Sequence, residues 1–371
     1  MDPSSIKRIA VLTGGGDAPG LNAVIRSVTR TAILQEGWEV LGVRYGFEGL
    51  LAADDPESVM KLDWAGTSGL LYRGGTILGA ASYTNEKLSF KNEKGQSIVS
   101  DWAKQRVRER LRELEVDALV IIGGDGTMGM GQQFFEAGVP LVGVPKTIDN
   151  DLEATEFTFG FDSALDEATD ALDRLHTTAE SHDRVMVLEV MGRNSGWIAL
   201  HSGVAGSADV ILIPEIPFTI PAICEKIEER RRRGRKFSIV VVAEGAKPDG
   251  GEQMYLDYEG KKSLGGIGQW VAEQITAQCG VESRTVVLGH LQRGGSPSAF
   301  DRILATLFGG SAVRLISKGK FGYMTALQCG DVVSVPIKEA IGGQKKVAVD
   351  GKLVQTARGL GISFGAPITR S

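Results

Sequence analysis

Residues 118–127 read Ala-Leu-Val-Ile-Ile-Gly-Gly-Asp-Gly-Thr, an apolar run that ends in a glycine-rich loop. A near-continuous Val/Ile/Leu run predicts a strand covered on both faces, as in parallel sheets flanked by helices. Glycines directly after such a strand leave backbone N–H groups bare, which suits phosphate oxygens. The carboxylate of Asp125 is a usual partner for Mg²⁺ that bridges phosphates, and the hydroxyl of Thr127 can add a hydrogen bond. This stretch therefore predicts an α/β fold with phosphate chemistry at a strand end.

Apolar runs of the same kind recur along the chain and predict further strands. They are Ile9–Leu12, Val40–Val43, Leu141–Val144, Val185–Val190, Val210–Ile213, Ser238–Ala243 and Val286–Leu288. Between strands, Asn22–Glu36 and Asp162–His176 carry apolar residues at helical spacing, and Gly37 is a natural stop for the first helix. This alternation predicts an α/β fold of two Rossmann-like lobes, with mainly parallel sheets flanked by helices.

Length and composition exclude several classes of protein. The chain has 371 residues, with 41 basic and 46 acidic side chains, so we expect two domains and a net charge of −5. Mild acidity argues against nucleic acid as a partner, and no apolar run approaches the roughly 18 residues of a membrane span. The three cysteines, Cys224, Cys279 and Cys329, match no metal spacing. We therefore expect free thiols in a reducing compartment and a cytoplasmic protein.

A second glycine-rich loop follows the first predicted strand. Thr13-Gly14-Gly15-Gly16-Asp17-Ala18-Pro19-Gly20 leads into a predicted helix, whose free N–H groups and positive dipole end suit a phosphate. The loop is not a dinucleotide fingerprint, because Pro19 occupies the third glycine position, and the chain has no Walker-type lysine. A tight strand-to-helix turn without a ligand is the alternative interpretation.

A third strand end carries two carboxylates. After Val144 the chain reads Pro145-Lys146-Thr147-Ile148-Asp149-Asn150-Asp151. In phosphoryl transfer, one carboxylate can accept the proton of the attacking hydroxyl while cations neutralise the transferring group. A solvated acidic turn is the alternative. The string Gly-Gly-Asp-Gly-Thr also occurs in NAD kinases and diacylglycerol kinases, so by itself it indicates only a phosphoryl donor.

Taken in order, the three loops resemble those of the phosphofructokinase family, and later segments agree. The later segments are Arg184, Met191-Gly192-Arg193, Pro214-Glu215, Glu244, Gly289-His290-Leu291-Gln292-Arg293-Gly294-Gly295-Ser296-Pro297 and Asp301-Arg302. The resemblance extends from about Ile9 to Gly309. A NAD or lipid kinase, the competing enzyme class, would lack the later segments.

The resemblance implies Mg²⁺-dependent transfer of the γ-phosphoryl group of ATP to the 1-hydroxyl of fructose 6-phosphate, a step of glycolysis. Asp149 resembles the base that takes the hydroxyl proton, with Thr147 and Asp151 beside it. Asp125 resembles the magnesium ligand, and Arg193 resembles the arginine that stabilises the transferring group. The residues implied in donor binding are Gly14, Gly15, Gly16, Gly126, Thr127, Lys146 and Arg73.

The resemblance also implies a sugar-phosphate site. Its residues are Thr147, Asp149, Met191, Gly192, Arg193 and Glu244 for the sugar, and Arg184, Arg284, His290 and Arg293 for the 6-phosphate. A dianionic phosphate favours several cationic donors, and guanidinium groups bind it bidentately. In the family, the equivalents of Arg184 and Arg284 come from a neighbouring subunit. We therefore expect a homo-oligomer, usually a tetramer, with active sites shared between subunits.

The phosphoryl donor depends on a few positions. Gly126 leaves open the space of a nucleotide α-phosphate, whereas pyrophosphate-dependent members usually carry aspartate there. Lys146 is the residue of pyrophosphate enzymes and can coexist with either donor, so the pair resembles the mixed-substrate subfamily and favours ATP. Ser82 stands where the family commonly has a donor-binding arginine, and its charge would have to come from Arg73, Lys87, Lys91 or Lys146. Met130 replaces a glycine beside the adenine. Pyrophosphate remains the alternative donor.

We expect the two lobes to interleave along the chain. Residues 1–160 with about 291–345 should form the donor lobe, and 161–290 with about 346–371 the fructose 6-phosphate lobe. A non-catalytic regulatory subunit is the second alternative. It would be expected to have lost Asp125, Asp149 or Arg193, and the chain retains all three.

Overall fold

The computed structural model describes residues 3–52, 55–80, 85–92, 97–258 and 261–366. The chain folds into two compact units, unit 1 (Met1–Ser163 with Arg293–Gly343) and unit 2 (Ala164–Gln292 with Gln344–Ser371). It therefore passes between the units three times, after Ser163, after Gln292 and after Gly343. The assignment of the donor to one unit and the sugar to the other stays a prediction.

Unit 1 is built on a seven-stranded sheet in the order β15-β14-β7-β6-β1-β2-β3. The strands are β1 (Arg8–Thr13), β2 (Glu39–Val43), β3 (Val59–Leu62), β6 (Ala118–Gly123), β7 (Leu141–Pro145), β14 (Tyr323–Gln328) and β15 (Asp331–Pro336). All neighbours pair in parallel except β3 and β15, which pair antiparallel at the two edges. A small antiparallel pair, β4 (Ser89–Lys91) and β5 (Ser97–Val99), lies outside this sheet.

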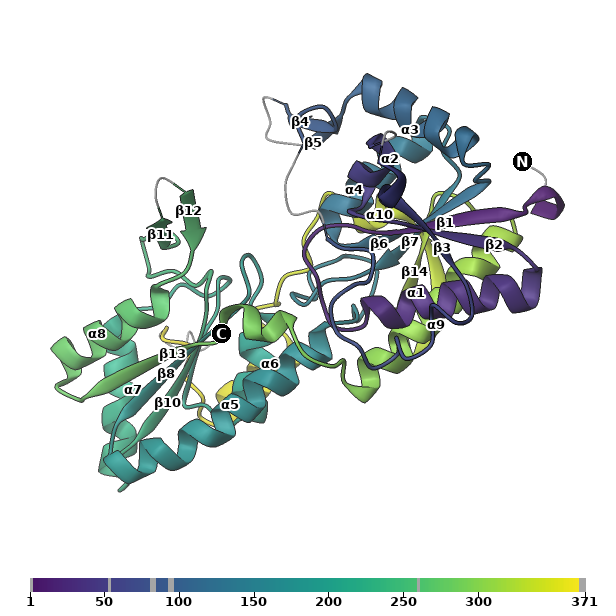
Figure 1. Cartoon of the computed structure of the whole chain (residues 1–371). Coiled ribbons are helices and arrows are strands. Elements are labelled where there is room, and N and C mark those ends of the chain that lie inside the picture. Colours follow the sequence, from purple (N-terminus) through teal and green to yellow (C-terminus); the bar gives the residue numbers. More distant parts are fainter. Residues whose placement is uncertain (1–2, 53–54, 81–84, 93–96, 259–260, 367–371) are drawn as a thin grey trace. The chain divides into compact units, whose positions relative to one another are not determined.

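Helices cover both faces of the large sheet (Figure 1). The helices of this unit are α1 (Leu21–Thr31), α2 (Phe47–Leu51), α3 (Asp101–Glu113), α4 (Asp125–Glu136), α9 (Ala299–Ser317) and α10 (Ile337–Ala340). The apolar sides of α1 and α9 share one core with the sheet, whereas α3, α4 and α10 share the core on the other face. Burial on both faces explains why β1 and β6 are apolar along almost their whole length.

Unit 2 has a four-stranded parallel sheet in the order β13-β8-β10-β9. Its strands are β8 (Val185–Val190), β9 (Val210–Leu212), β10 (Ser238–Ala243) and β13 (Ser283–Val287), and β11 (Tyr255–Tyr258) pairs with β12 (Lys261–Leu264) outside it. Its helices are α6 (Trp197–Ala205), α7 (Ile220–Arg232), α8 (Ile267–Cys279) and α11 (Lys352–Gly359), while α5 (Phe161–His182) begins in unit 1. One face of the sheet packs on α7 and α8.

The predicted α/β fold with mainly parallel sheets is confirmed, and element ends differ where local geometry changes. The first predicted helix ends as α1 at Thr31 and continues as one π-helical turn, Ala32–Glu36. Gly37 then stops it at φ 71°, a conformation that glycine adopts without a Cβ clash. The second predicted helix, α5, continues past His176 to His182.

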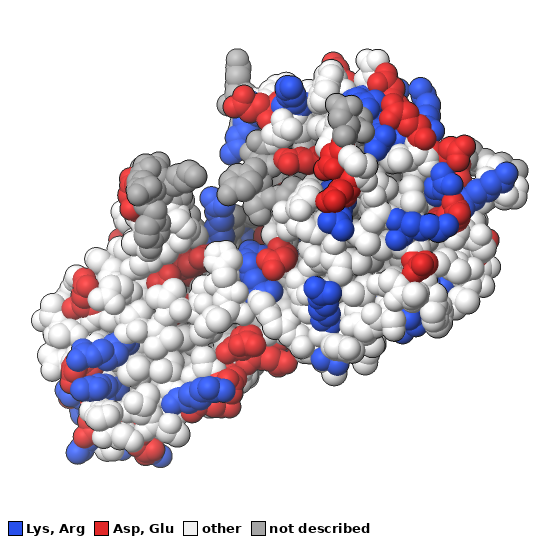
Figure 2. Space-filling model, viewed as in Figure 1, with Lys and Arg blue, Asp and Glu red and all other residues white. Residues whose placement is uncertain are grey.

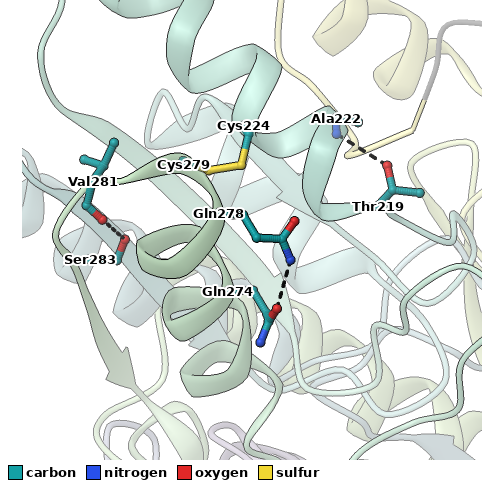
Figure 3. Close-up of a disulfide and its surroundings, with 8 residues drawn as sticks. All are labelled: Thr219, Ala222, Cys224, Gln274, Gln278, Cys279, Val281 and Ser283. Carbon is teal, nitrogen blue, oxygen red and sulfur yellow. Dashed lines mark hydrogen bonds between the residues drawn. A yellow bond between two sulfur atoms is a disulfide. The ribbon is translucent and has the colours of Figure 1, made fainter.

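The prediction of three free thiols is wrong. Cys224 on α7 and Cys279 at the end of α8 form a disulfide across 55 residues of sequence (Figure 3), and Cys329 alone is free. The helices bring the pair together because α7 and α8 pack side by side on one face of the sheet. Sequence spacing identifies metal motifs but does not reveal which distant cysteines face each other.

Two surface observations bear on partners. Within the described ranges, none of the helices combines the length and apolar character that a membrane crossing needs. On the visible face, Lys and Arg side chains alternate with Asp and Glu, so neither sign forms a continuous field there (Figure 2). Such mixed charge differs from the basic stripe typical of a nucleic-acid interface.

Candidate active site

Two glycine loops of unit 1 meet at the carboxyl ends of adjacent strands β1 and β6. The N–H of Gly14 donates to the carbonyl oxygen of Ile122 at 2.8 Å. A Cβ at Gly14 would lie 2.5 Å from Oγ1 of Thr127, and one at Gly123 would lie 2.4 Å from it. Only glycine therefore fits at either position. Thr127 is 3% exposed, packed between the loops, and its role as a phosphate ligand stays a prediction.

Lys146 joins the third loop to the first. It directly follows β7, its N–H donates to the Gly123 carbonyl at 2.9 Å, and its Nζ donates to the Gly16 carbonyl at 2.5 Å. The side chain is only 4% exposed. Burial, helped by the charge of Arg293, lowers the pKa of Lys146 to about 8, against the opposing effect of Asp17 and other nearby carboxylates. The three loops and this ammonium thus lie together at the carboxyl ends of β1, β6 and β7.

The pKa of Lys146 predicts a pH dependence of donor use. The pKa of Lys146 in the folded protein lies below the ordinary value of 10.5, so its side chain becomes neutral as pH rises through about 8. We expect kcat/KM for the donor to fall between pH 7 and pH 9, because kcat/KM reports ionisation of the free enzyme. The free energy of unfolding should instead rise with pH between about 8 and 10.5. In this range Lys146 is protonated in the unfolded chain and largely neutral in the folded one, so the unfolded chain binds more protons.

Initial rates across this pH range measure the effect. A matched Lys146→Met variant should have lower kcat/KM and should lack the decline that begins near pH 8. If the variant shows the same decline as the native enzyme, the titrating group is not Lys146.

Asp125 has the properties of a cation ligand. It begins α4, and its Oδ1 is buried without a hydrogen-bond partner. Burial raises the pKa of Asp125, with a smaller rise from Asp151, while a bond from the N–H of Gly342 acts in the opposite direction. A bound Mg²⁺ would offset both effects and take its other ligands from water and donor phosphates. No group of three or more Asp, Glu, His or Cys side chains suited to a metal ion occurs among the described residues.

The loop with two carboxylates is held by a residue whose role the sequence analysis did not recognise. Asn150 is 3% exposed and has φ 49°, a left-handed conformation that asparagine tolerates. Its Nδ2 donates to the Glu156 carbonyl at 3.2 Å, and its Oδ1 accepts the N–H of Thr158 at 3.1 Å. Oγ1 of Thr147 accepts the N–H of Asp149 at 3.1 Å. These hydrogen bonds hold the backbone of the loop at Asp149.

A second unrecognised residue, Asn22, positions the segment that carries Arg73. Asn22 is fully buried at the start of α1, and its Nδ2 donates to the carbonyls of Arg73 and Gly74, each at 3.1 Å. The only sequence signal was the position of an asparagine directly after a glycine loop, and its burial is known from the structure. The side chain of Arg73 is exposed, and Met130 is half-buried on α4. Ser82 lies outside the described residues.

Arg293 lies in unit 1, against the first glycine loop. Its Nη1 donates to the carbonyl of Asp17 at 3.0 Å, and a Cβ at Gly16 would lie 3.0 Å from the same nitrogen. The other predicted 6-phosphate residues, Arg184, Arg284 and His290, belong to unit 2. The assignment of Arg293 to the 6-phosphate stays a prediction.

In unit 2, the loops after β8 and β10 are joined. The N–H of Glu244 donates to the Val190 carbonyl at 2.8 Å, and the N–H of Gly245 donates to the Gly192 carbonyl at 3.1 Å. Gly192 has φ 136°, and a Cβ there would lie 2.8 Å from the Ser195 carbonyl, so the turn requires glycine. Glu244 thus lies beside the predicted sugar residues Met191 and Gly192.

The chain also matches proteins of known name. The phosphofructokinase model matches residues 8–316. The chain is 53% identical over 362 residues to the ATP-dependent 6-phosphofructokinase of Chloroflexus aggregans, covering 98% of this chain and 99% of the relative.

The chain belongs to the phosphofructokinase family. It is also 50% identical over 344 residues to the pyrophosphate–fructose 6-phosphate 1-phosphotransferase of Amycolatopsis methanolica, covering 92% of this chain and 96% of that one. Among solved structures, the Pichia pastoris phosphofructokinase in the T-state matches with a TM-score of 0.77 and 32% identity, over 91% of this chain and 35% of the other. The fold and the phosphotransferase class predicted from the sequence are therefore confirmed.

Within this phosphofructokinase chain, Arg184 and Arg284 lie at the amino ends of the unit 2 strands, whereas Glu244 follows the carboxyl end of β10. Arg184 precedes β8, and Arg284 pairs with Met186 near the start of β13. Both arginines form ion pairs with Glu282. Nε of Arg184 lies 3.0 Å from Oε2 of Glu282. Since β8 has six residues, the amino and carboxyl ends of the strands lie about 20 Å apart at about 3.3 Å per residue.

Proposed function

We propose that this chain is a 6-phosphofructokinase that transfers the γ-phosphoryl group of ATP to the 1-hydroxyl of fructose 6-phosphate. The products are ADP and fructose 1,6-bisphosphate, a step of glycolysis. The observation that carries the proposal is the meeting of three loops at the ends of β1, β6 and β7, with the Lys146 ammonium bound to Gly16. Glycine loops without side chains and one buried cation, with Asp125 at the start of α4, suit a donor phosphate chain.

The residues of the chain divide the work. Asp149 takes the proton of the 1-hydroxyl as the hydroxyl oxygen bonds to the γ-phosphorus. The bond from this phosphorus to the bridging oxygen of the β-phosphate breaks, ADP leaves with the electron pair, and Arg193 neutralises the charge that develops on the transferring group. Gly14, Gly15 and Lys146 hold the donor phosphates. Asp125 would hold Mg²⁺, which supplies charge neutralisation across the donor phosphates when bound.

ATP is favoured over pyrophosphate by the space at Gly126. This residue is exposed near the start of α4, and nothing lies within 4 Å of the place where its Cβ would be. That opening leaves room for a nucleotide beyond the terminal phosphates. Pyrophosphate is the second candidate donor, because buried Lys146 resembles the lysine of pyrophosphate enzymes and one half-identical relative bears that name.

The test is the initial rate with fructose 6-phosphate and Mg²⁺, with ATP and pyrophosphate at matched concentrations. We expect a strong preference for ATP. A preference for pyrophosphate would overturn the donor assignment but not the acceptor. Activity with neither donor would support the regulatory-subunit alternative.

The 6-phosphate site is proposed to be shared between subunits of a homotetramer. Arg184 and Arg284 lie at the amino ends of the unit 2 strands, and Met191 and Glu244 lie at the carboxyl ends. Arginines at the amino ends cannot reach a sugar bound near Glu244 of the same unit, but they can bind the 6-phosphate in the active site of a second copy of the chain. The ion pairs with Glu282 hold both guanidinium groups in one place for that purpose.

Mixed oligomers test this sharing. We expect Arg184→Ala and Asp149→Asn each to be nearly inactive, and equal mixtures, dissociated and reassembled, to recover activity. If each site takes Asp149 from one chain and Arg184 from another, about a quarter of the sites in random mixtures are intact. Absence of recovery, with each reassembled variant shown to be oligomeric, would place Arg184 in its own chain's site or in none.

A cytoplasmic location is also proposed, on the basis of the phosphorylated metabolites that the reaction uses. The Cys224–Cys279 disulfide argues in the other direction, since disulfides are rare in reducing compartments. Thiol labelling of the protein isolated from cells, with and without a reductant, measures which form is present.

A further inference from the structure

The loop after β8, residues 191–196 and called here the sugar loop, is fastened at both ends. At its start, the N–H of Met191 donates to Oε1 of Gln292 at 2.7 Å. At its end, the N–H of Gly196 donates to Oε1 and Oε2 of Glu215 at 3.0 and 3.1 Å. Exposed Arg193 lies between these two fixed points. Neither Gln292 nor Glu215 has a part in the function proposed above.

Gln292 connects the start of the sugar loop to two passages of the chain between the units. It is the last residue of unit 2 before the second passage, and its side chain is fully buried. Its Nε2 donates to the carbonyl of Ala164 at 3.3 Å, and Ala164 is the first residue after the first passage. One amide therefore holds Met191 and both passages together.

Glu215 connects the end of the sugar loop to the third passage. Its Oε1 also accepts the N–H of Val347 at 2.9 Å, in the segment that begins at Gln344. The carboxylate lies at the N-terminus of α6, where Gly196 supplies no side-chain cap, so it offsets the free N–H groups and the helix dipole. Nε1 of Trp197 donates to the carbonyl of Lys345 at 2.8 Å, which ties the same segment to α6 a second time.

From these bonds we infer that Glu215 and Gln292 are positioning residues that hold the sugar loop in register with the three places where the chain enters or leaves unit 2. The sugar loop cannot shift relative to these places within unit 2 unless one of the hydrogen bonds breaks. Affinity for fructose 6-phosphate therefore depends on two side chains that do not contact it. This inference rests on the proposed site, in which Met191, Gly192 and Arg193 bind the sugar.

The experiment compares variants in the full-length enzyme. Glu215→Ala and Gln292→Leu should each raise the KM for fructose 6-phosphate about tenfold, because small misplacements of binding groups are costly. The KM for ATP should stay within about twofold, whereas kcat should fall as well, because the same loop carries Arg193. Glu215→Gln should recover most of the loss, because Oε1 alone accepts both N–H groups, and a glutamine carbonyl can take its place. Direct binding of fructose 6-phosphate without ATP should show the same order of affinities.

Two controls make the result decisive. Asp209→Asn alters another buried carboxylate of unit 2, which accepts the N–H of Ile239 at 2.9 Å away from the sugar loop, and should leave the KM for fructose 6-phosphate unchanged. An unchanged KM in Glu215→Ala and Gln292→Leu, or equal increases for both substrates, would overturn the inference.

Arg193→Gln separates this failure from failure of the proposed site. If Arg193→Gln raises the KM for fructose 6-phosphate and the positioning variants do not, only the inference is wrong. If Arg193→Gln changes neither this KM nor kcat, Arg193 acts on neither the sugar nor the transferring group, and the site assignment is overturned as well.

Discussion

Replacement of Asp149 by asparagine is expected to lower kcat by about 10²–10⁴-fold, with little change in the KM for fructose 6-phosphate. The amide has nearly the same shape but cannot take the proton of the 1-hydroxyl. The loop should keep its conformation, because the N–H of Asp149 is held by Thr147 and the neighbouring turn by Asn150. Steady-state rates at saturating ATP measure the effect.

The matched control is Asp151→Asn, which removes the other carboxylate of the same loop. We expect a smaller loss of kcat, because Asp151 lies near Asp125 and acts through the charge of the donor site. If Asp149→Asn retained kcat within a few-fold of the native value, another group would have to be the base.

Replacement of Gly126 by aspartate is expected to lower kcat/KM for ATP by at least about a hundredfold, with a much smaller effect on pyrophosphate. The new carboxylate would occupy the opening beside the glycine loops, where it would repel the α-phosphate, and like-charge contacts cost several kcal/mol. The fold should tolerate the change, because nothing lies within 4 Å of the new Cβ and an acidic residue suits the first turn of α4.

Gly126→Ala is the control for this prediction, since it adds the Cβ without the charge. It should leave the kcat/KM for ATP within a few-fold of the native value, and the unfolding temperatures of both variants should match that of the native protein. Equal loss for ATP and pyrophosphate in Gly126→Asp would show that the residue does not select the donor.

Much of the fold follows from local patterns. The uninterrupted apolar run in residues 118–123 predicts a strand buried on both faces, and β6 is buried along its whole length. The glycines of both loops were predicted to follow strands, and the parallel pairing of β1 with β6 shows that the two loops lie side by side at the carboxyl ends. These predictions succeed because strand period, glycine turns and helix starts depend on residues that are adjacent in sequence.

Other features depend on residues that are distant in sequence. Cys224 and Cys279 were expected to be free thiols, because no local spacing reveals that α7 and α8 pack together. Asn22 and Asn150 read as ordinary polar residues until their buried hydrogen bonds are seen. The resemblance identified Arg184 and Arg284 as candidate phosphate ligands, but only the strand register shows that they lie at the amino ends of their strands.

The sequence by itself therefore determined the α/β class, the three strand-end loops and the phosphotransferase chemistry. The tertiary structure alone decided that Lys146 closes onto Gly16, that two cysteines join, and that Gln292 and Glu215 fasten the sugar loop. The physical reason is one of range. Backbone preference and hydrophobic period act over a few residues, whereas a buried hydrogen bond between distant residues forms only where the topology of the whole unit brings its donor and acceptor together.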